Sequence, residues 1–205
     1  MLSVEPLHSG DPLPRDVPPG QLRQLLHQIQ QDIDTGVESQ RQALMDRAWV
    51  LLMLHSGLRT GEIRHLRLGD LDLDRRQVRI EQGKGLQDRA VFLSREGVEA
   101  LKTYLAVRGP AATDPVFIYR HRPLSSGYCG QRLRGWGRRC GVYITPHQLR
   151  YSSTTLLLNA GMPILTVQRI LGHQNVETTL RYARLYDCTA VNDYRRAMGV
   201  IRDKA

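Results

Sequence analysis

The 205-residue chain lacks several features that would place it in a large class of proteins. No apolar run approaches the roughly 20 residues needed to cross a bilayer, and the N-terminus lacks the basic-then-apolar pattern of a secretory signal peptide. The three cysteines, Cys129, Cys140 and Cys188, show no Cys-x-x-Cys spacing, so neither a disulfide framework nor a zinc site is indicated. These absences favour a protein of the reducing cytoplasm.

Acidic residues are missing from a long internal segment. None lies between Pro115 and Val176, whereas eight arginines do, and the whole chain carries a net charge of +9. An arginine-rich composition explains the arginines but not the missing acids. A segment of one sign would repel itself unless a polyanion neutralised it, and DNA is the commonest such partner. The candidate DNA-binding residues of this segment are Arg120, Arg122, Arg132, Arg134, Arg138 and Arg139.

Apolar periodicity predicts a mainly helical protein. Residues 1–19 contain five prolines and no periodicity, so they are predicted to be a flexible arm or linker. Helices are predicted over residues 19–33, 39–55, 60–66, 95–107, 126–140, 146–160, 163–171, 176–183 and 187–199. The second of these is apolar nearly all round toward its end, which is typical of a central buried helix.

Two short segments alternate like half-buried strands. They cover residues 78–81 and 89–93 and flank the turn Gly83-Lys84-Gly85. The apolar run at residues 116–119 is expected to add a third strand. The predicted fold is therefore mainly α with a small three-stranded antiparallel sheet on one edge, an α+β domain.

The last third of the chain concentrates the reactive side chains. Pro146-His147-Gln148-Leu149-Arg150, Leu171-Gly172-His173 and Thr178-Thr179-Leu180-Arg181-Tyr182 follow one another within 37 residues. Each group stands at the start or end of a short predicted helix. Two imidazoles, one guanidinium and one phenol could together hold an anionic phosphate and attack it.

Two upstream motifs complete a specific pattern. Arg59 lies in His55-Ser56-Gly57-Leu58-Arg59-Thr60-Gly61-Glu62-Ile63, and Lys84 lies between two glycines. With the three later motifs, they resemble the catalytic domain of the tyrosine recombinases, the phage-integrase family of DNA breaking and rejoining enzymes. The resemblance covers about residues 40–200 and implies a mostly helical fold with a three-stranded sheet.

Metal-free cleavage of a phosphodiester needs a nucleophile, cations on the non-bridging oxygens and an acid for the leaving 5′-oxygen. Tyr182 is the candidate nucleophile, since it lies nine residues after His173 in Thr-Thr-x-x-Tyr, as in the family pattern. A phenolate is also a good enough leaving group for the reverse step, which suits reversible strand exchange. Arg59 and Arg150 form the candidate phosphate clamp, because planar guanidinium forks match two phosphate oxygens and stay charged.

The remaining candidates move protons or orient the clamp. Lys84 can lose a proton, which arginine almost never does, and in the resembling family a lysine at this hairpin is the general acid. His147 and His173 would hydrogen-bond the phosphate or assist proton transfer. Glu62 lies one helical turn from Arg59 and is either the carboxylate that orients a guanidinium or an ordinary first-turn acid. No metal or nucleotide cofactor is implied.

The resemblance also sets expectations for domains. They are an arm at 1–19, a catalytic domain at 20–186, and a C-terminal helix at 187–205 that either exchanges between protomers or folds back on its own domain. Fewer than 60 residues precede Arg59, so the N-terminal core-binding domain that usually closes around the duplex is expected to be missing. Tyr151-Ser152 stands where the family commonly has His-Thr or His-Ser after Arg150.

Strand cleavage and rejoining at a specific site of duplex DNA is the expected function. It would proceed through a 3′-phosphotyrosyl intermediate, in a homo-oligomer that is a tetramer on DNA and has no membrane partner. Two alternatives stay open at this point. One is supercoil relaxation by a type IB topoisomerase-like monomer, and the other is a DNA-binding accessory module that does not cut.

Overall fold

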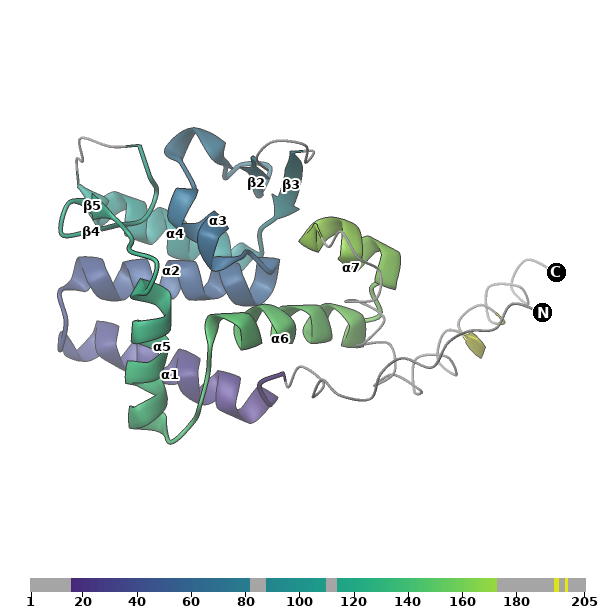
Figure 1. Cartoon of the computed structure of the whole chain (residues 1–205), viewed down its shortest axis with the longest axis horizontal. Coiled ribbons are helices and arrows are strands. Elements are labelled where there is room, and N and C mark those ends of the chain that lie inside the picture. The colour runs from purple at the N-terminus through teal and green to yellow at the C-terminus, as the bar shows by residue number, and fades with distance from the viewer. Residues whose placement is uncertain (1–15, 82–87, 110–113, 173–193, 196–197, 199–205) are drawn as a thin grey trace.

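Helix α2 (Gln40–Ser56) runs through the middle of the protein, and most of the other helices pack against it (Figure 1). The structure is a computed structural model that describes residues 16–81, 88–109, 114–172, 194–195 and 198. The other described helices are α1 (Pro19–Thr35), α3 (Thr60–His65), α4 (Arg95–Arg108), α5 (Tyr128–Cys140), α6 (Pro146–Asn159) and α7 (Ile164–Leu171). The helices predicted over 176–183 and 187–199 lie outside the described residues.

Local signals fix both ends of α2. The Ser39 hydroxyl accepts a hydrogen bond from the Gln42 amide at its start, a cap worth about 1 kcal/mol. Gly57 ends the helix in the left-handed conformation, with a φ of 65°, and its amide donates to the Met53 carbonyl at 3.1 Å. Between these caps the helix is buried on almost every face, with Trp49 fully enclosed. The prediction of a central buried helix is confirmed.

The three-stranded antiparallel sheet has the order β1-β2-β3, formed by Leu71–Asp72, Gln77–Ile80 and Arg89–Phe92. Val78 pairs with Leu71 on one side and with Val91 on the other. Both valines are fully buried, so one face of the sheet packs on the helical core. The predicted fold class, mainly helical with a small three-stranded antiparallel sheet, is confirmed.

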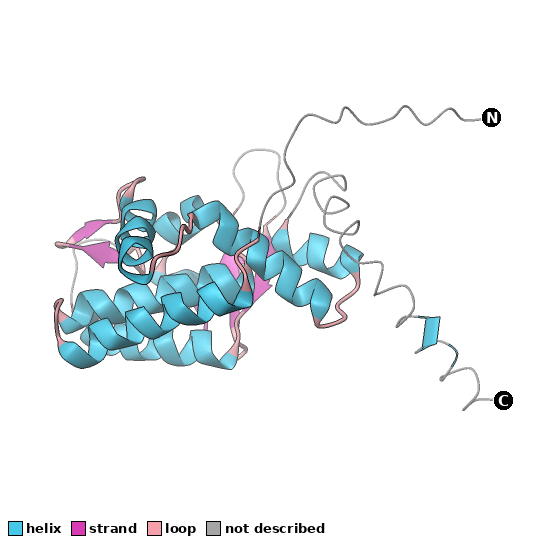
Figure 2. Cartoon of the chain, turned by 90° about the horizontal axis from the view of Figure 1, so that it is seen from below, coloured by secondary structure: helices cyan, strands magenta, loops and turns pink. Residues whose placement is uncertain are grey.

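The prediction for the third strand was wrong. Ile118–Tyr119 forms β4, which pairs with β5 (Arg122–Pro123) in a separate hairpin, well apart from the three-stranded sheet (Figure 2). The apolar run that suggested a strand is buried in the core, where the Ile118 amide donates to the Tyr104 hydroxyl at 3.2 Å. The actual third strand, β1, is only two residues long, too short to show an alternating pattern.

Helix α7 contacts both strand β3 and helix α6 (Figure 1). Leu171 and Val167 on α7 and Leu158 on α6 form a second small apolar cluster. Gly172 ends α7 in the left-handed conformation, with a φ of 62°, as the Leu-Gly-His motif predicts. No helix within the described ranges is long and apolar enough to cross a membrane.

Candidate active site

Three consecutive carbonyl oxygens at the end of α7, those of residues 170–172, each accept a hydrogen bond from a different arginine. The last carbonyls of a helix have no partner within it and carry partial negative charge, so cationic donors suit them. The pairs are Arg89 Nε to Ile170 (3.1 Å), Arg150 Nη2 to Leu171 (2.7 Å) and Arg59 Nη2 to Gly172 (2.9 Å). The three arginines come from β3, α6 and the start of α3.

Arg59 is the N-cap residue of α3, and Glu62 in the first turn of that helix holds it in two ways. The Arg59 amide donates to Glu62 Oε2 at 2.8 Å, and its Nη1 donates to Glu62 Oε1 at 2.9 Å. The Arg59 side chain is 43% exposed, so it reaches solvent while its direction is fixed. Both interpretations of Glu62 fit this geometry, because Oε2 makes the capping bond of a first-turn acid and Oε1 holds the guanidinium.

Arg150 is buried and joins the ends of two helices. Besides its bond to Leu171, its Nη1 donates to the carbonyl oxygen of Gly57, the C-cap of α2. Arg59 and Arg150 are far apart in the sequence, yet their guanidinium groups bond adjacent carbonyls. The structure therefore brings together the two members of the predicted phosphate clamp.

Sequence reasoning missed Arg89, the first residue of β3. Its Nη2 forms an ion pair with Glu62 Oε1 at 2.8 Å, and its side chain is only 10% exposed. A signal was present in the sequence, because alternation along the strand places Arg89 on the same face as buried Val91. An arginine on the buried face of a strand requires an acidic or carbonyl partner.

Burial alone would raise the pKa of the Glu62 carboxyl. The hydrogen bond from the Arg59 amide and the positive charges of Arg89 and Arg150 outweigh that effect, so the pKa lies below its ordinary value. Glu62 is therefore ionised at neutral pH and remains an acceptor for both guanidinium groups that contact it.

Of the other predicted catalytic residues, the structure describes only His147. His147 is exposed in the first turn of α6, one turn before Arg150. The Thr145 hydroxyl caps this helix by accepting from the Gln148 amide at 3.2 Å, and Gln148 Oε1 accepts from the Thr145 amide. Lys84, His173 and Tyr182 lie outside the described residues, although His173 directly follows Gly172 in the sequence.

Two of the six candidate DNA-binding arginines have partners inside the protein. Arg132 bonds fully buried Asp46 at 2.7 Å and also pairs with Glu38. Arg139 bonds buried Asp32 through both terminal nitrogens, at 2.8 and 2.6 Å. These contacts argue against a phosphate contact for either residue, because breaking them leaves a buried charge uncompensated.

The other four candidates are exposed and have no ion pair within the described part of the chain. They stand on two elements, the β4–β5 hairpin and helix α5. At the tip of the hairpin, Arg120 and His121 have positive φ angles of 49° and 62°. These four residues are Arg120, Arg122, Arg134 and Arg138, whereas Arg139 is exposed but pairs with Asp32.

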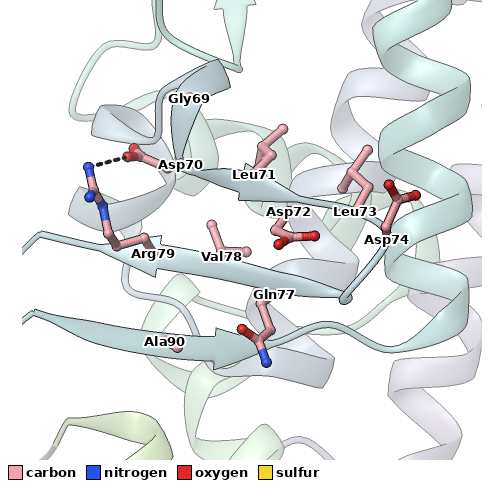
Figure 3. A pocket seen from close by; sticks show the side chains of 10 residues that line it. All are labelled: Gly69, Asp70, Leu71, Asp72, Leu73, Asp74, Gln77, Val78, Arg79 and Ala90. Atoms are coloured by element: carbon pink, nitrogen blue, oxygen red, sulfur yellow. Dashed lines mark ion pairs between the residues drawn. The ribbon is translucent and has the colours of Figure 1, made fainter.

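The pocket in Figure 3 lies beside β1 and β2, has a volume of about 550 Å³ and is acidic. Asp70, Asp72 and Asp74 line it; Asp70 pairs with Arg79 at 3.9 Å, and Asp72 pairs with Arg75 at 3.8 Å. None of Arg59, His147 and Arg150 lines this pocket. Among the residues that the structure describes, no three His, Cys, Asp or Glu side chains are grouped to hold a metal ion.

Comparison with known proteins identifies the family. Residues 16–188 match the phage integrase family, and the chain belongs to it. It is 36% identical over 143 residues to the tyrosine recombinase XerA of Thermococcus kodakarensis, an alignment that covers 68% of this chain and 51% of that protein. It is 34% identical over 178 residues to the tyrosine recombinase XerC of Actinobacillus pleuropneumoniae, with 84% and 55% covered.

A solved structure shows the same fold. The crystal structure of a XerA recombinase superposes with a TM-score of 0.76 at 27% identity and covers 92% of this chain and 67% of that one. The chain spans about half the length of the curated relatives it matches. The resemblance inferred from the sequence motifs is confirmed.

Proposed function

We propose that this chain is the catalytic part of a site-specific DNA recombinase that cuts and rejoins duplex DNA through a 3′-phosphotyrosyl intermediate. The observation that carries the proposal is the placement of Arg59 and Arg150 on adjacent carbonyls at the end of α7. Two forked cations held this close together are suited to the charge of a pentavalent phosphorus. The similarity to tyrosine recombinases supports the same reaction class.

The proposed reaction conserves the phosphodiester bond energy. The Tyr182 hydroxyl attacks phosphorus and gives its proton to His147 or His173, a new O–P bond forms, and the bond to the 5′-oxygen breaks. Lys84 gives a proton to that 5′-oxygen, while Arg59, Arg150, His147 and His173 stabilise the phosphorane. In the second step, a 5′-hydroxyl of another strand gives its proton to the now neutral Lys84 and attacks the phosphotyrosine. The tyrosine leaves and takes back its proton, so no strand is hydrolysed.

We propose duplex DNA as the partner and a tetramer on that DNA as the working assembly. The exposed arginines on α5 and the β4–β5 hairpin would contribute phosphate contacts. In the proposed division of the chain, residues 20–186 are the catalytic domain, 1–19 are an arm, and 187–205 are a helix exchanged between protomers. The cytoplasm is the proposed location, because the reaction needs access to chromosomal or mobile-element DNA.

Trapping a covalent adduct tests the chemistry. The protein is mixed with a library of nicked duplexes of randomised sequence. Because of the nick, the short fragment that carries the freed 5′-hydroxyl diffuses away after cleavage, so the strand cannot be rejoined. We expect denaturation-resistant protein–DNA adducts, and sequencing the linked DNA gives the preferred site. Tyr182→Phe should abolish the adduct, whereas Tyr186→Phe, a nearby phenol, should not.

Two results would contradict the proposal. The first is no adduct from the wild type over the whole library, which leaves a DNA-binding module. The second is an undiminished adduct from Tyr182→Phe. Relaxation of supercoiled plasmid without exchange between two selected sites would instead indicate a topoisomerase-like outcome.

The proton donor is tested separately with a substrate whose 5′-bridging oxygen is replaced by sulfur. A thiolate leaves without protonation, because its conjugate acid has a pKa of about 8.5. Lys84→Ala should therefore form adducts slowly with the oxygen substrate and at close to the wild-type rate with the sulfur substrate. An equally slow reaction with both substrates would remove Lys84 from this role.

A further inference from the structure

We propose that Arg89 is a positioning residue of the cleavage site, because its guanidinium clamps the C-terminal end of α7 to the carboxylate that orients Arg59. The inference rests on the proposed function, since it names a residue that supports the same site. Arg89 would not contact the substrate. It would act through Glu62 and through the carbonyl of Ile170.

The planar guanidinium of Arg89 makes two hydrogen bonds that link α7 to Glu62. Arg89 Nε donates to the Ile170 carbonyl at 3.1 Å, and Arg89 Nη2 donates to Glu62 Oε1 at 2.8 Å. The same Oε1 also accepts from Arg59 Nη1 at 2.9 Å. One carboxylate oxygen is thus shared by a buried guanidinium and an exposed one, so the position of Arg89 fixes the position from which Glu62 holds Arg59.

Both members of the buried pair are shielded from water. The side chains of Arg89 and Glu62 are 10% and 12% exposed, respectively, whereas Arg59 is 43% exposed. Shielded charges are screened little by salt, and removing one partner leaves the other uncompensated. The Arg59 amide holds the other carboxylate oxygen of Glu62, Oε2, at 2.8 Å. The buried Arg89 pair therefore supplies the shielded restraint on Oε1, the oxygen that the exposed guanidinium of Arg59 also contacts.

Arg89 also occupies a junction in the chain. It opens β3 five residues after Lys84, and it bonds the last turn of α7, after which Gly172 leads to His173. Strand β3 and helix α7 are direct neighbours (Figure 1). A single side chain thus links the strand that follows the proposed acid, the helix end that precedes a proposed histidine, and the carboxylate behind one arm of the phosphate clamp.

Precise placement of the phosphate clamp, Arg59 and Arg150, matters more for the rate of the chemical step than for DNA affinity. A misplacement of about 1 Å at a catalytic group can cost about 100-fold in rate, whereas DNA affinity is spread over many phosphate contacts. Loss of a positioning residue should slow the chemical step at saturating DNA and leave the dissociation constant almost unchanged. Loss of a merely structural arginine would lower stability and leave both the rate of the chemical step and the dissociation constant unchanged.

The test compares Arg89→Met with Arg108→Met as a matched control. Arg108 is also a buried arginine that bonds backbone carbonyls, but these belong to Val116 and Pro115, at 3.0 and 2.7 Å, in the segment before β4 and not to α7. Adduct formation is measured in a single turnover with a saturating concentration of the selected duplex, at a temperature well below the melting temperatures of both variants. The dissociation constant is measured in the Tyr182→Phe background, so that cleavage does not interfere.

We expect Arg89→Met to form adduct about 10- to 100-fold more slowly, with a dissociation constant within about twofold of the wild type. Arg108→Met should be less stable but react within about twofold of the wild-type rate. Arg89→Lys keeps a charge for Glu62 but lacks the planar fork, so it should recover part of the rate. If Arg89→Met does not fold, Arg89→Lys carries the same comparison.

Three results would overturn the inference. They are an unchanged rate in Arg89→Met, an equal loss in Arg108→Met, and weaker DNA binding with an unchanged rate. Hydrogen exchange of residues 164–172 without DNA gives an independent reading, because Arg89→Met should speed exchange there and Arg108→Met should not. If the wild type forms no adduct, the proposed function fails, while the exchange data still show whether Arg89 holds α7.

Discussion

Gly57 lies directly against Leu171, at the point where the end of α2 meets the end of α7. A Cβ added to Gly57 would overlap Leu171 Cδ2 and come within 3.2 Å of Ser153 Oγ. The φ of Gly57 is 65°, a left-handed conformation that favours glycine. The same residue offers its carbonyl oxygen to Arg150. The absence of a side chain at Gly57 thus lets α7 come close enough for one arginine to bond both helix ends.

Gly57→Ala should therefore destabilise the protein and disturb the site. We expect a loss of about 1 kcal/mol from the left-handed backbone and about 1 to 3 kcal/mol more from the overlap with Leu171, measured by urea unfolding. Gly36→Ala is the control, since Gly36 has a φ of 63° and no heavy atom within 4 Å of an added Cβ. Equal losses in the two variants would show that the contact with Leu171 costs nothing.

Replacing Arg59 or Arg150, the two arginines of the phosphate clamp, should have similar effects on the rate of adduct formation but different effects on the free energy of unfolding. Lysine keeps the charge but loses the fork, so Arg59→Lys and Arg150→Lys should each slow adduct formation by about 100-fold or more. Arg59 is partly exposed, so its replacement should change the free energy of unfolding by less than about 1 kcal/mol. Arg150 is buried between two carbonyls, and its replacement should cost about 2 to 3 kcal/mol.

Adduct rates and urea midpoints of the same preparations check this pair. An Arg59→Lys protein that is as active as the wild type would remove Arg59 from the clamp. An Arg150→Lys protein that is fully stable would mean that the buried carbonyls of Gly57 and Leu171 find other donors.

The sequence predicted the fold where local signals were strong. The predicted ranges 39–55, 95–107 and 163–171 agree to within one residue with α2, α4 and α7, whose ends are set by Ser39 and Gly57, by Ser94 and by Gly172, respectively. The sequence did not predict strand β1, because a two-residue strand carries no periodicity and forms only when β2 is beside it.

The site was predictable only in part, for the same physical reason. Motifs identified Arg59 and Arg150, but their common target, the carbonyls at the end of α7, is a property of packing that no motif encodes. Arg89 belongs to no motif that was singled out, and its partners Glu62 and Ile170 are distant in sequence. Charge patterning also cannot tell an exposed Arg138 from an Arg132 that is paired with Asp46, so it places both in the candidate DNA-binding set.

That distinction gives a prediction for DNA binding. Arg134→Gln and Arg138→Gln together should weaken binding and reduce the magnitude of the log–log salt slope by about 0.9 for each lost phosphate contact. Stability should change by less than about 0.5 kcal/mol, because both side chains are exposed. Titrations at four or more salt concentrations measure the slope.

Arg132→Gln is the counterpart. It should cost about 3 to 5 kcal/mol, because it strands the fully buried carboxylate of Asp46, and its salt slope should equal that of the wild type. A slope that falls in Arg132→Gln and not in the double variant would reverse the assignment of these arginines.

Asp46 itself gives a pH prediction. It is fully buried and accepts hydrogen bonds from Trp49 at 2.7 Å, Tyr128 at 2.9 Å and Arg132 at 2.7 Å. Burial is the largest influence and raises its pKa from 3.8 to about 6, against the opposing effect of Arg132 and the two neutral donors, with the negative charge of Glu38 adding to the rise. The folded protein therefore holds this proton more tightly than the unfolded chain does.

The sign follows from proton linkage. Between about pH 4 and pH 6 the folded state binds more protons at Asp46, so this group's contribution to stability is greatest below pH 4 and falls as the pH rises, by at most about 1.4 kcal/mol per pH unit. Asp32 and Glu62 have lowered pKa values and act in the opposite direction, but they are common to the wild type and Asp46→Asn. The difference in unfolding free energy, wild type minus Asp46→Asn, should therefore decrease from pH 4 to pH 6 and level off above it. A difference that instead increases with pH would mean that pairing with Arg132 outweighs burial, and that Asp46 is ionised in the core at acidic pH.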